Sequence, residues 1–382
     1  MHLKISSHRD SSHHLLVGGY DKGLKDAIYS ISYDLSEASM RKGGLNVYLH
    51  ESLGYEVELS RTCYPYKSLG YGVELLDSCN GLVFLVYFDS DNNHGGSGCR
   101  EDLFFCLWNP ATGEYKKIVK PTSNFAYVKF SMCAFGYDHK SDDYKLVIGV
   151  DNGQVSSSVH IYTLGSDSWK STVTVNYSFD SDRKSGLFVN GGFHWLADEE
   201  QGKLIVSLDI NEERFGEIEL PTELEANERC SYITEGLLDG RLCVLVADDG
   251  YYNPRAVGVW VMQDYGVRET WDKCYDITHE KLTDELSDRY SPCLKFICSL
   301  KDGEILFMTL DKLVLYDPKN RSAGERYTGS VKGFRSKVNY FESLVSVHSG
   351  TCMRKRKREE SNETQEAYEE KHENVLLEWL AL

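Results

Sequence analysis

The chain has 382 residues and a formal net charge of -17 at pH 7. A nucleic-acid binder or a protein held on an anionic membrane needs a cationic face, so this charge argues against both classes. The hydrophobic content of 41% is enough to fill a core. With 25 Tyr, 32 Gly and only 7 Pro, the composition favours strands joined by tight turns over a helical bundle.

The 11 cysteines are an odd number, and several lie inside apolar runs, such as Cys106 in LFFCLW, Cys243 in RLCVLV and Cys298 in KFICSL. Cysteines in such runs pack as small hydrophobic side chains in a reducing compartment. The sequence has no CxxC pair or Cys/His quartet with zinc spacing, no apolar signal-peptide core and no stretch of membrane-helix length. We therefore expect a cytoplasmic or nuclear protein without a metal or a cofactor.

Six polar hairpin turns follow one another along the chain, each between a strand with bulky apolar residues and a bulky residue on the return. They are YDLSEAS (33–39), WNPATGEY (108–115), YTLGSDSW (162–169), LDINEERF (208–215), WVMQDYGVRETW (260–271) and YDPKNRS (316–322). A second recurring unit lies between these turns, usually with Asn-Gly, Asp-Gly or Gly-Gly before an apolar strand. Its copies are CNGLVFLV, FGYDHKSDDYKLVIGV, GLFVNGGFHWLAD, GLLDGRLCVLVAD and SLKDGEILFMTL. These dipeptides are strong hairpin signals.

From the second copy onward the two units alternate with a period of roughly 50 residues, the range of propeller blades. A sheet of this size has too little core of its own and becomes stable by stacking on its neighbours around an axis. The repeat therefore predicts an all-β, kelch-like propeller of roughly six blades. We place this domain at residues 1–352 and predict a charged, largely disordered tail at 353–382.

Insertions are expected between the strands. Residues 89–102 form a polar, Gly-rich stretch that includes Asn92, Asn93 and His94, and residues 247–256 include Tyr251, Tyr252 and Asn253. Residues 278–288 are compatible with a short helical excursion. Rigid aromatics on loops held by a stiff scaffold give contact area at low entropic cost, so both loops are candidates for partner binding. The Gly-rich loop is equally compatible with a flexible insertion, and the tyrosine loop is the better candidate.

No set of residues assembles into a catalytic site. His194, in GGFHWLAD, titrates in the right pH range for catalysis, but it lies in a strand pattern with no nucleophile elbow nearby, which favours a structural role. Trp108, Trp169, Trp195, Trp260 and Trp271 recur at equivalent places in the units, which favours packing between blades. The acidic clusters at 141–143 and 248–249 lack calcium-loop spacing and are interpreted as solvated turns.

The tail contains one further motif, the basic run Arg354, Lys355, Arg356, Lys357 and Arg358. A run of this length is compatible with a nuclear import signal and equally with a solvated tail.

The units, in this order, resemble the F-box-associated domain of plant F-box proteins, the kelch-like type that includes the S-locus F-box group. The resemblance is carried by CNGLVFL (79–85), WNPATGEYKKI (108–118), FGYDHKSDDYKLV (135–147), VHIYTLGSDSWK (159–170), LIVSLDINEERFGEIELP (204–221), GVWVMQDYGVRETW (258–271) and YFESLVSV (340–347). It covers roughly residues 79–347 and depends on several ordered motifs at repeat-like spacing.

The resemblance implies a non-catalytic, protein-binding module: the substrate-recognition part of a Skp1–cullin–F-box ubiquitin ligase, which captures target proteins for ubiquitination. In such proteins an N-terminal F-box binds a Skp1-type adaptor. The first 20 residues here are similar to the stretch that follows an F-box, so this partner is expected only if a missing N-terminal F-box exists. The alternative is an F-box-less protein that binds or shields targets outside the ligase. A galactose-oxidase-like propeller enzyme lacks its metal-ligand constellation in this sequence.

Overall fold

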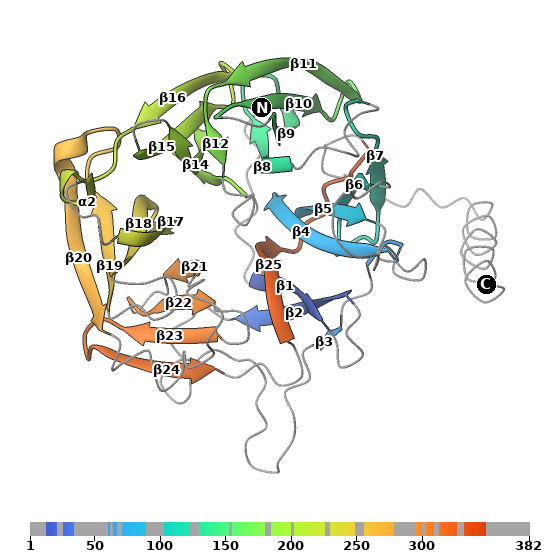
Figure 1. Ribbon diagram of the computed structural model, residues 1–382. Helices are drawn as coiled ribbons and strands as arrows, with labels where there is room; N and C mark the ends of the chain where they lie inside the picture. The colour runs from blue at the N-terminus through green and yellow to red at the C-terminus, as the bar shows by residue number, and fades with distance from the viewer. Residues whose placement is uncertain are drawn as a thin grey trace, which may run out of the picture. The chain divides into compact units, whose positions relative to one another are not determined.

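The protein is described by a computed structural model at residues 13–20, 26–33, 60–61, 64–66, 71–88, 103–122, 130–152, 155–179, 185–199, 202–225, 230–248, 256–278, 295–299, 303–308, 313–326 and 332–348. Across these residues the strands form six antiparallel sheets, which follow one another around a ring (Figure 1). The predicted six-bladed, all-β propeller is thereby confirmed. We number the sheets as blades 1 to 6.

The first three blades take their strands from the first half of the chain, apart from β25. Blade 1 has the order β25 (Lys332–Phe341), β1 (His13–Tyr20), β2 (Asp26–Tyr33) and β3 (Ser60–Arg61). Blade 2 consists of β4 (Gly72–Cys79), β5 (Leu82–Phe88), β6 (Leu103–Trp108) and β7 (Tyr115–Ile118). Blade 3 consists of β8 (Phe130–Asp138), β9 (Asp143–Asp151), β10 (Ser157–Thr163) and β11 (Ser168–Val175).

The other three blades follow in chain order. Blade 4 consists of β12 (Ser178–Phe179), β14 (Gly192–Glu199), β15 (Gly202–Asp209) and β16 (Arg214–Ile218), with β13 (Leu187–Val189) also paired to β14. A short helix, α2 (Thr222–Glu225), follows it. Blade 5 consists of β17 (Cys230–Leu238), β18 (Arg241–Asp248), β19 (Ala256–Met262) and β20 (Trp271–Thr278), with the 3-10 helix η3 (Arg268–Thr270) before β20. Blade 6 consists of β21 (Lys295–Ser299), β22 (Ile305–Met308), β23 (Leu313–Asp317) and β24 (Ser322–Arg326).

The hydrophobic cores lie between neighbouring blades. Strand β5 explains how: its seven residues are all buried, and alternate side chains point to opposite faces of the sheet. Leu82 and Phe84 pack toward blade 3, whereas Val83 and Leu85 pack toward blade 1. A strand that serves two cores must be apolar at every position, which is why it appears in the sequence as a continuous apolar run.

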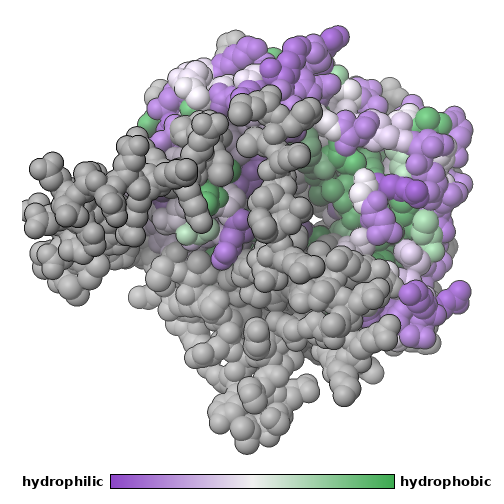
Figure 2. All heavy atoms as spheres, turned by 180° about the vertical axis from the view of Figure 1, so that it is seen from behind, coloured by the Kyte–Doolittle hydropathy of each residue, from purple (hydrophilic) through white to green (hydrophobic). Residues whose placement is uncertain are grey.

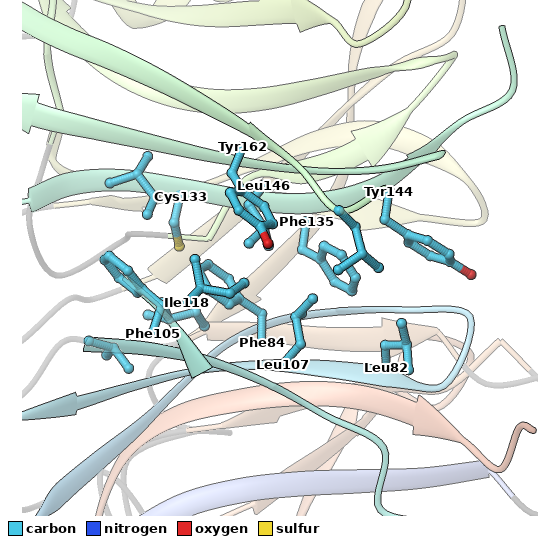
Figure 3. Close-up of a cluster of buried hydrophobic side chains, with 14 of the residues drawn as sticks. Leu82, Phe84, Phe105, Leu107, Ile118, Cys133, Phe135, Tyr144, Leu146 and Tyr162 are labelled. Atoms are coloured by element: carbon cyan, nitrogen blue, oxygen red, sulfur yellow. The ribbon is translucent and has the colours of Figure 1, made fainter. Parts of the chain in front are cut away.

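The core between blades 2 and 3 shows the packing most clearly (Figure 3). Phe84, Phe105 and Ile118 from blade 2 point toward Phe135 and Tyr162 from blade 3. The rings of Phe84 and Phe105 have centroids 5.6 Å apart, and Phe135 stacks on Tyr144 at 5.5 Å. Since neither sheet can bury this surface alone, the blades depend on each other for stability.

Polar bonds also cross every junction between blades in the described part of the chain. One such hydrogen bond can be named for each junction. In ring order, starting between blades 1 and 2 and ending between blades 6 and 1, the donors and acceptors are Leu75 N to Ser336 Oγ, Phe135 N to Asp77 Oδ2, Gly186 N to Cys133 O, Trp271 Nε1 to Glu219 O, Asp239 N to Ser299 Oγ and Lys337 Nζ to Phe296 O. These bonds add directional contacts between the blades to the apolar packing, and the bond from Leu75 N also satisfies a buried backbone group.

Blade 1 closes the ring by combining strands from both ends of the propeller. The C-terminal strand β25 pairs antiparallel with β1, His13 opposite Phe341 and Val17 opposite Lys337. The chain then continues past β25 to blade 2, where Ser343 Oγ donates to Asn80 O at 2.6 Å. Gly81 at this point has φ of +79°, and a side chain there would collide with Ser343, so the site requires glycine.

Three of the predicted hairpin turns and the turn at Asp138, which belongs to the second recurring unit, share one construction. At Asn109, Asp138, Asp209 and Asp317 the side-chain Oδ1 accepts hydrogen bonds from the backbone N–H groups two and three residues later. The residue four positions later has positive φ in each case, namely Gly113, Asp142, Glu213 and Arg321. In these four turns the Asx bonds hold the backbone and the left-handed residue reverses the chain. Antiparallel pairing of the flanking strands confirms five of the six predicted copies as hairpins. Most of the first copy, at 34–39, lies outside the described residues.

Four other predicted segments also lie wholly or mostly outside the described residues. They are the insertion at 89–102, the central part of the insertion at 247–256, most of the short helix at 278–288 and the tail at 353–382. The domain boundary near residue 352 therefore stays a prediction.

Candidate binding surface

The predicted partner-binding residues fall outside the part of the chain that the structure describes. This holds for Asn92, Asn93, His94, Tyr251, Tyr252 and Asn253, and for the basic run from Arg354 to Arg358. Their roles stay predictions.

The strands that anchor the two predicted loops are nevertheless described. One stretch connects β5 to β6 and the other connects β18 to β19, so each joins the second and third strands of its blade. Blades 2 and 5 have the same strand order, and equivalent strands run in the same direction around a propeller. The flanking ends of β5 and β18 therefore face the same side of the ring.

A small hollow of about 200 Å³ lies between the turns of blades 4 and 5. It is lined by Val189, Asn190, Gly240, Arg241, Leu242, Met262, Gln263 and Tyr265. The volume is that of one large side chain. Arg241 is held at its edge by a hydrogen bond of 2.5 Å from its guanidinium to Gln263 Oε1. This hollow suits one apolar or aromatic side chain of a partner.

His194 supports this hollow from beneath. The ring is fully buried on β14, with Nε2 at 2.6 Å from the hydroxyl of Tyr265 and Nδ1 at 3.3 Å from Leu187 O. Burial lowers the pKa of His194, while hydrogen bonds from the ring to the backbone at Leu187 and Gly192 oppose this effect. A neutral, hydrogen-bonded ring under a surface tyrosine is a structural histidine, as the sequence indicated.

Exposed apolar side chains surround the same junction. Tyr265 and Val267, in the turn between β19 and β20, are 43% and 44% exposed. Phe188 on β13 is also exposed, but it contacts Phe193 on the face of blade 4 that packs toward blade 3. Figure 2 shows hydrophobic surface gathered in a hollow bordered by hydrophilic side chains, on the side of the ring where Figure 1 places β14, β17 and β18. Apolar patches rimmed by polar residues are typical of protein interaction sites.

A larger groove, of about 470 Å³, lies on the outside of the ring between blades 3 and 4. Its lining consists of Val173, Val175, Asn176, Tyr177, Glu199, Glu213, Arg214, Phe215 and Glu217. No motif in the sequence predicted this groove. Its acidic residues and its exposed valine lie on three separate segments, and no single stretch of the sequence signals their meeting.

The five recurrent tryptophans pack between blades, as predicted. Trp169 Nε1 donates to Val119 O at 2.7 Å, Trp195 Nε1 to Cys133 O at 3.0 Å and Trp271 Nε1 to Glu219 O at 3.0 Å, each in the preceding blade or just after it. Trp108 lies in the core between blades 1 and 2, and Trp260 packs against the core between blades 4 and 5.

A buried cation joins the turns of blades 3 and 4. Lys145 Nζ lies 2.7 Å from Asp138 Oδ2 and 3.0 Å from Glu213 Oε1, and it donates to Ile210 O at 2.9 Å. Burial lowers the pKa of Lys145, but the two carboxylates favour the charged form of the side chain, and the net effect is a raised pKa. The predicted acidic cluster at 141–143 belongs to the same turn region: Ser141 Oγ donates to Asp138 Oδ2, and Gly165 N donates to Asp143 Oδ2.

Among the described residues, no group of three or more His, Cys, Asp or Glu side chains could hold a metal ion. The same part of the chain contains no helix long and apolar enough to span a membrane. Cys106, Cys133 and Cys243 are buried free thiols, and burial raises the pKa of the Cys106 thiol to about 12.

Comparison with known proteins gives a consistent result. A family model described as the F-box associated beta propeller domain matches residues 26–347. An F-box/kelch-repeat protein of Arabidopsis thaliana is 26% identical over 283 residues, which is 70% of this chain and 68% of that protein. A second F-box protein of that plant is 29% identical, covering 72% of this chain and 68% of its own length. The F-box protein CPR1, also from Arabidopsis thaliana, is 25% identical, covering 74% and 73%.

Proposed function

The chain belongs to the family of F-box-associated β-propeller domains, and from this premise we propose that its propeller captures proteins for ubiquitination by a ligase of the Skp1–cullin–F-box type. The observation that carries the proposal is the extent of the family match, from the start of β2 through the segment that fastens the ring to blade 2. All six blades contribute strands to this range. The relatives it resembles are named as F-box proteins.

In this role the propeller is a rigid, non-catalytic scaffold. Its partners are the target protein and, through an F-box, a Skp1-type adaptor. The complex raises the effective concentration of the target near the ubiquitin-loaded enzyme and transfers nothing itself. Stacked blades with bonds across each described junction suit this task, because a preorganised surface loses little entropy on binding. The proposed site of action is the cytoplasm and nucleus.

Purification of the tagged native protein from its own tissue tests the proposal. We expect a Skp1-type adaptor and at least one further protein to co-purify, and we expect that further protein to carry ubiquitin and to accumulate when the native protein is depleted. Failure to recover any Skp1-type adaptor would contradict the ligase role. Bound proteins whose half-lives do not change on depletion would also contradict it.

A further inference from the structure

The groove between blades 3 and 4 has an apolar floor. Val173 on β11 is 50% exposed, and its neighbour Val175 belongs to the core between the two blades. Phe215 on β16 packs against the same core from the other side. Phe215 and Glu217 are two residues apart on a strand, so their side chains project from the same face of β16. An exposed valine beside a half-buried phenylalanine leaves apolar surface open at the bottom of the groove.

The two strands that border the groove are edge strands. β11 is the end strand of blade 3, and β16 is the end strand of blade 4, among the strands that the structure describes. An edge strand presents backbone N–H and C=O groups to an extended segment that lies beside it. The groove is therefore shaped for a stretch of extended chain more than for a compact small molecule.

The walls of the groove are negative. Glu199 ends β14 and Glu217 lies on β16, both exposed, and the hydroxyl of Tyr177 donates to Glu217 Oε1. Burial raises the pKa of Tyr177 to about 12, and the charges of Glu217 and Glu199 act in the same direction. Both carboxylates therefore act on the same point in the groove.

The other charges that line the groove are already paired. Glu213 lies 3.0 Å from Lys145 Nζ and 2.5 Å from Lys170 Nζ, which neutralise it. Arg214 lies 3.6 Å from Glu212 and is largely exposed. The negative potential of the groove therefore comes from Glu199 and Glu217. In a protein with a net charge of -17, this local field repels acidic partners and attracts basic ones.

We propose that this groove binds an extended, arginine- or lysine-bearing segment of a partner protein. The aliphatic stem of the basic side chain packs on Val173 and Phe215, and its cationic head bonds to Glu199 and Glu217. If the partner is the ligase target, the inference rests on the proposed function and gives that target a basic recognition segment. The binding itself does not depend on ubiquitination.

Selection from a random dodecapeptide phage library on the full 382-residue chain tests the proposal. We expect enrichment of peptides with Arg or Lys beside apolar residues, and weaker binding of those peptides to the Glu199→Gln/Glu217→Gln variant by roughly tenfold, the worth of two exposed ion pairs. The matched control is Glu223→Gln/Glu269→Gln, which removes the same charge at exposed sites outside the groove. Val173→Ser, which removes the most exposed apolar side chain of the floor, is expected to weaken binding independently of charge.

Selected peptides without basic residues, or equal binding by the wild type and the groove variant, would overturn the proposal. So would a groove variant that changes only the oligomeric state, because the occupant would then be a second copy of the chain. The two proposals can fail separately. Peptide binding at the groove without turnover of any bound protein contradicts the ligase role alone, whereas normal turnover of a target by the groove variant means that the ligase recognises it elsewhere.

Discussion

Asn109 and Val345 are joined across 236 residues of sequence: Asn109 Nδ2 donates to Val345 O at 2.8 Å. The same amide donates to Ser343 O at 3.0 Å, while Oδ1 holds the turn after β6. Asn109 is fully buried. One side chain therefore both holds an ordinary turn and bonds the segment after β25, residues 343–345, to blade 2. We call residues 343–345 the closing segment.

Replacing Asn109 by Ala is expected to reduce the free energy of unfolding by about 3 kcal/mol, because two part-buried carbonyls and a turn lose their partners together. The matched control is Asp317→Ala. Asp317 makes the same turn bonds to Lys319 N and Asn320 N but has no described contact with the closing segment. Its loss is expected to cost about 1 kcal/mol. Urea unfolding of both variants measures the difference. Equal losses of unfolding free energy would mean that the bonds from Asn109 to the closing segment contribute nothing to stability.

Asp77 predicts an unusual dependence of stability on pH. Its carboxylate lies between blades 2 and 3 and accepts hydrogen bonds from Phe135 N at 2.8 Å and Ser78 N at 2.7 Å. Burial raises the pKa of Asp77 from 3.8 to about 7, although both hydrogen bonds lower it. The folded protein then holds this proton more tightly than the unfolded chain. This contribution to stability is present below pH 3.8 and is lost as the pH rises through about 7.

The Asp77→Asn variant isolates this effect, since an amide does not titrate. We expect the stability of the variant relative to wild type to increase by about 2 kcal/mol between pH 5 and pH 8; each pKa unit is worth about 1.4 kcal/mol, reduced here because the residue is only half-buried. Taking the difference between the two proteins cancels the other titrating groups. A difference that stays constant with pH would show that Asp77 ionises in its ordinary range.

His194 predicts a dependence of the opposite sign. Burial lowers its pKa, so the unfolded chain binds the proton more tightly than the folded protein. This contribution is present above the unfolded pKa of about 6.5 and is lost as the pH falls through the folded value. We expect the stability advantage of wild type over His194→Gln to shrink between pH 7 and pH 5, measured by chemical unfolding. An advantage that grows on acidification would mean that the ring is stabilised in its charged form.

The features that could be predicted from the sequence are those that depend on a few neighbouring residues or on a residue repeated in each blade. The turns appear as Asx residues followed by a left-handed position, and Trp169 and Trp271 appear at equal places in the repeat. Each of these two indoles donates to the carbonyl one residue beyond the outer strand of the preceding blade, at Val119 after β7 and at Glu219 after β16. A repeated contact of this kind leaves a repeated residue in the sequence.

The long-range joints could not be predicted in the same way. Asn109 and Asp317 begin the same turn, and only Asn109 has a side-chain N–H to donate, but the acceptor that gives this N–H its role lies 234 residues away at Ser343. In the sequence Asp77 resembles a solvated polar residue after an apolar pair, and only its position on an inner strand beside Phe135 takes it partly out of solvent. The groove between β11 and β16 likewise depends on which strands become the edges of their sheets.

The tyrosine loop supplies the last prediction. Tyr251 and Tyr252 lie outside the described residues, between the end of β18 at Asp248 and the start of β19 at Ala256. We expect Tyr251→Ala/Tyr252→Ala to weaken capture of the co-purified target without changing the unfolding transition, since loop residues contribute to contact more than to the core. Quantitative co-purification alongside a thermal melt measures both. Unchanged capture would place the contact surface elsewhere, and a lower melting temperature would show that the two rings belong to the packed structure.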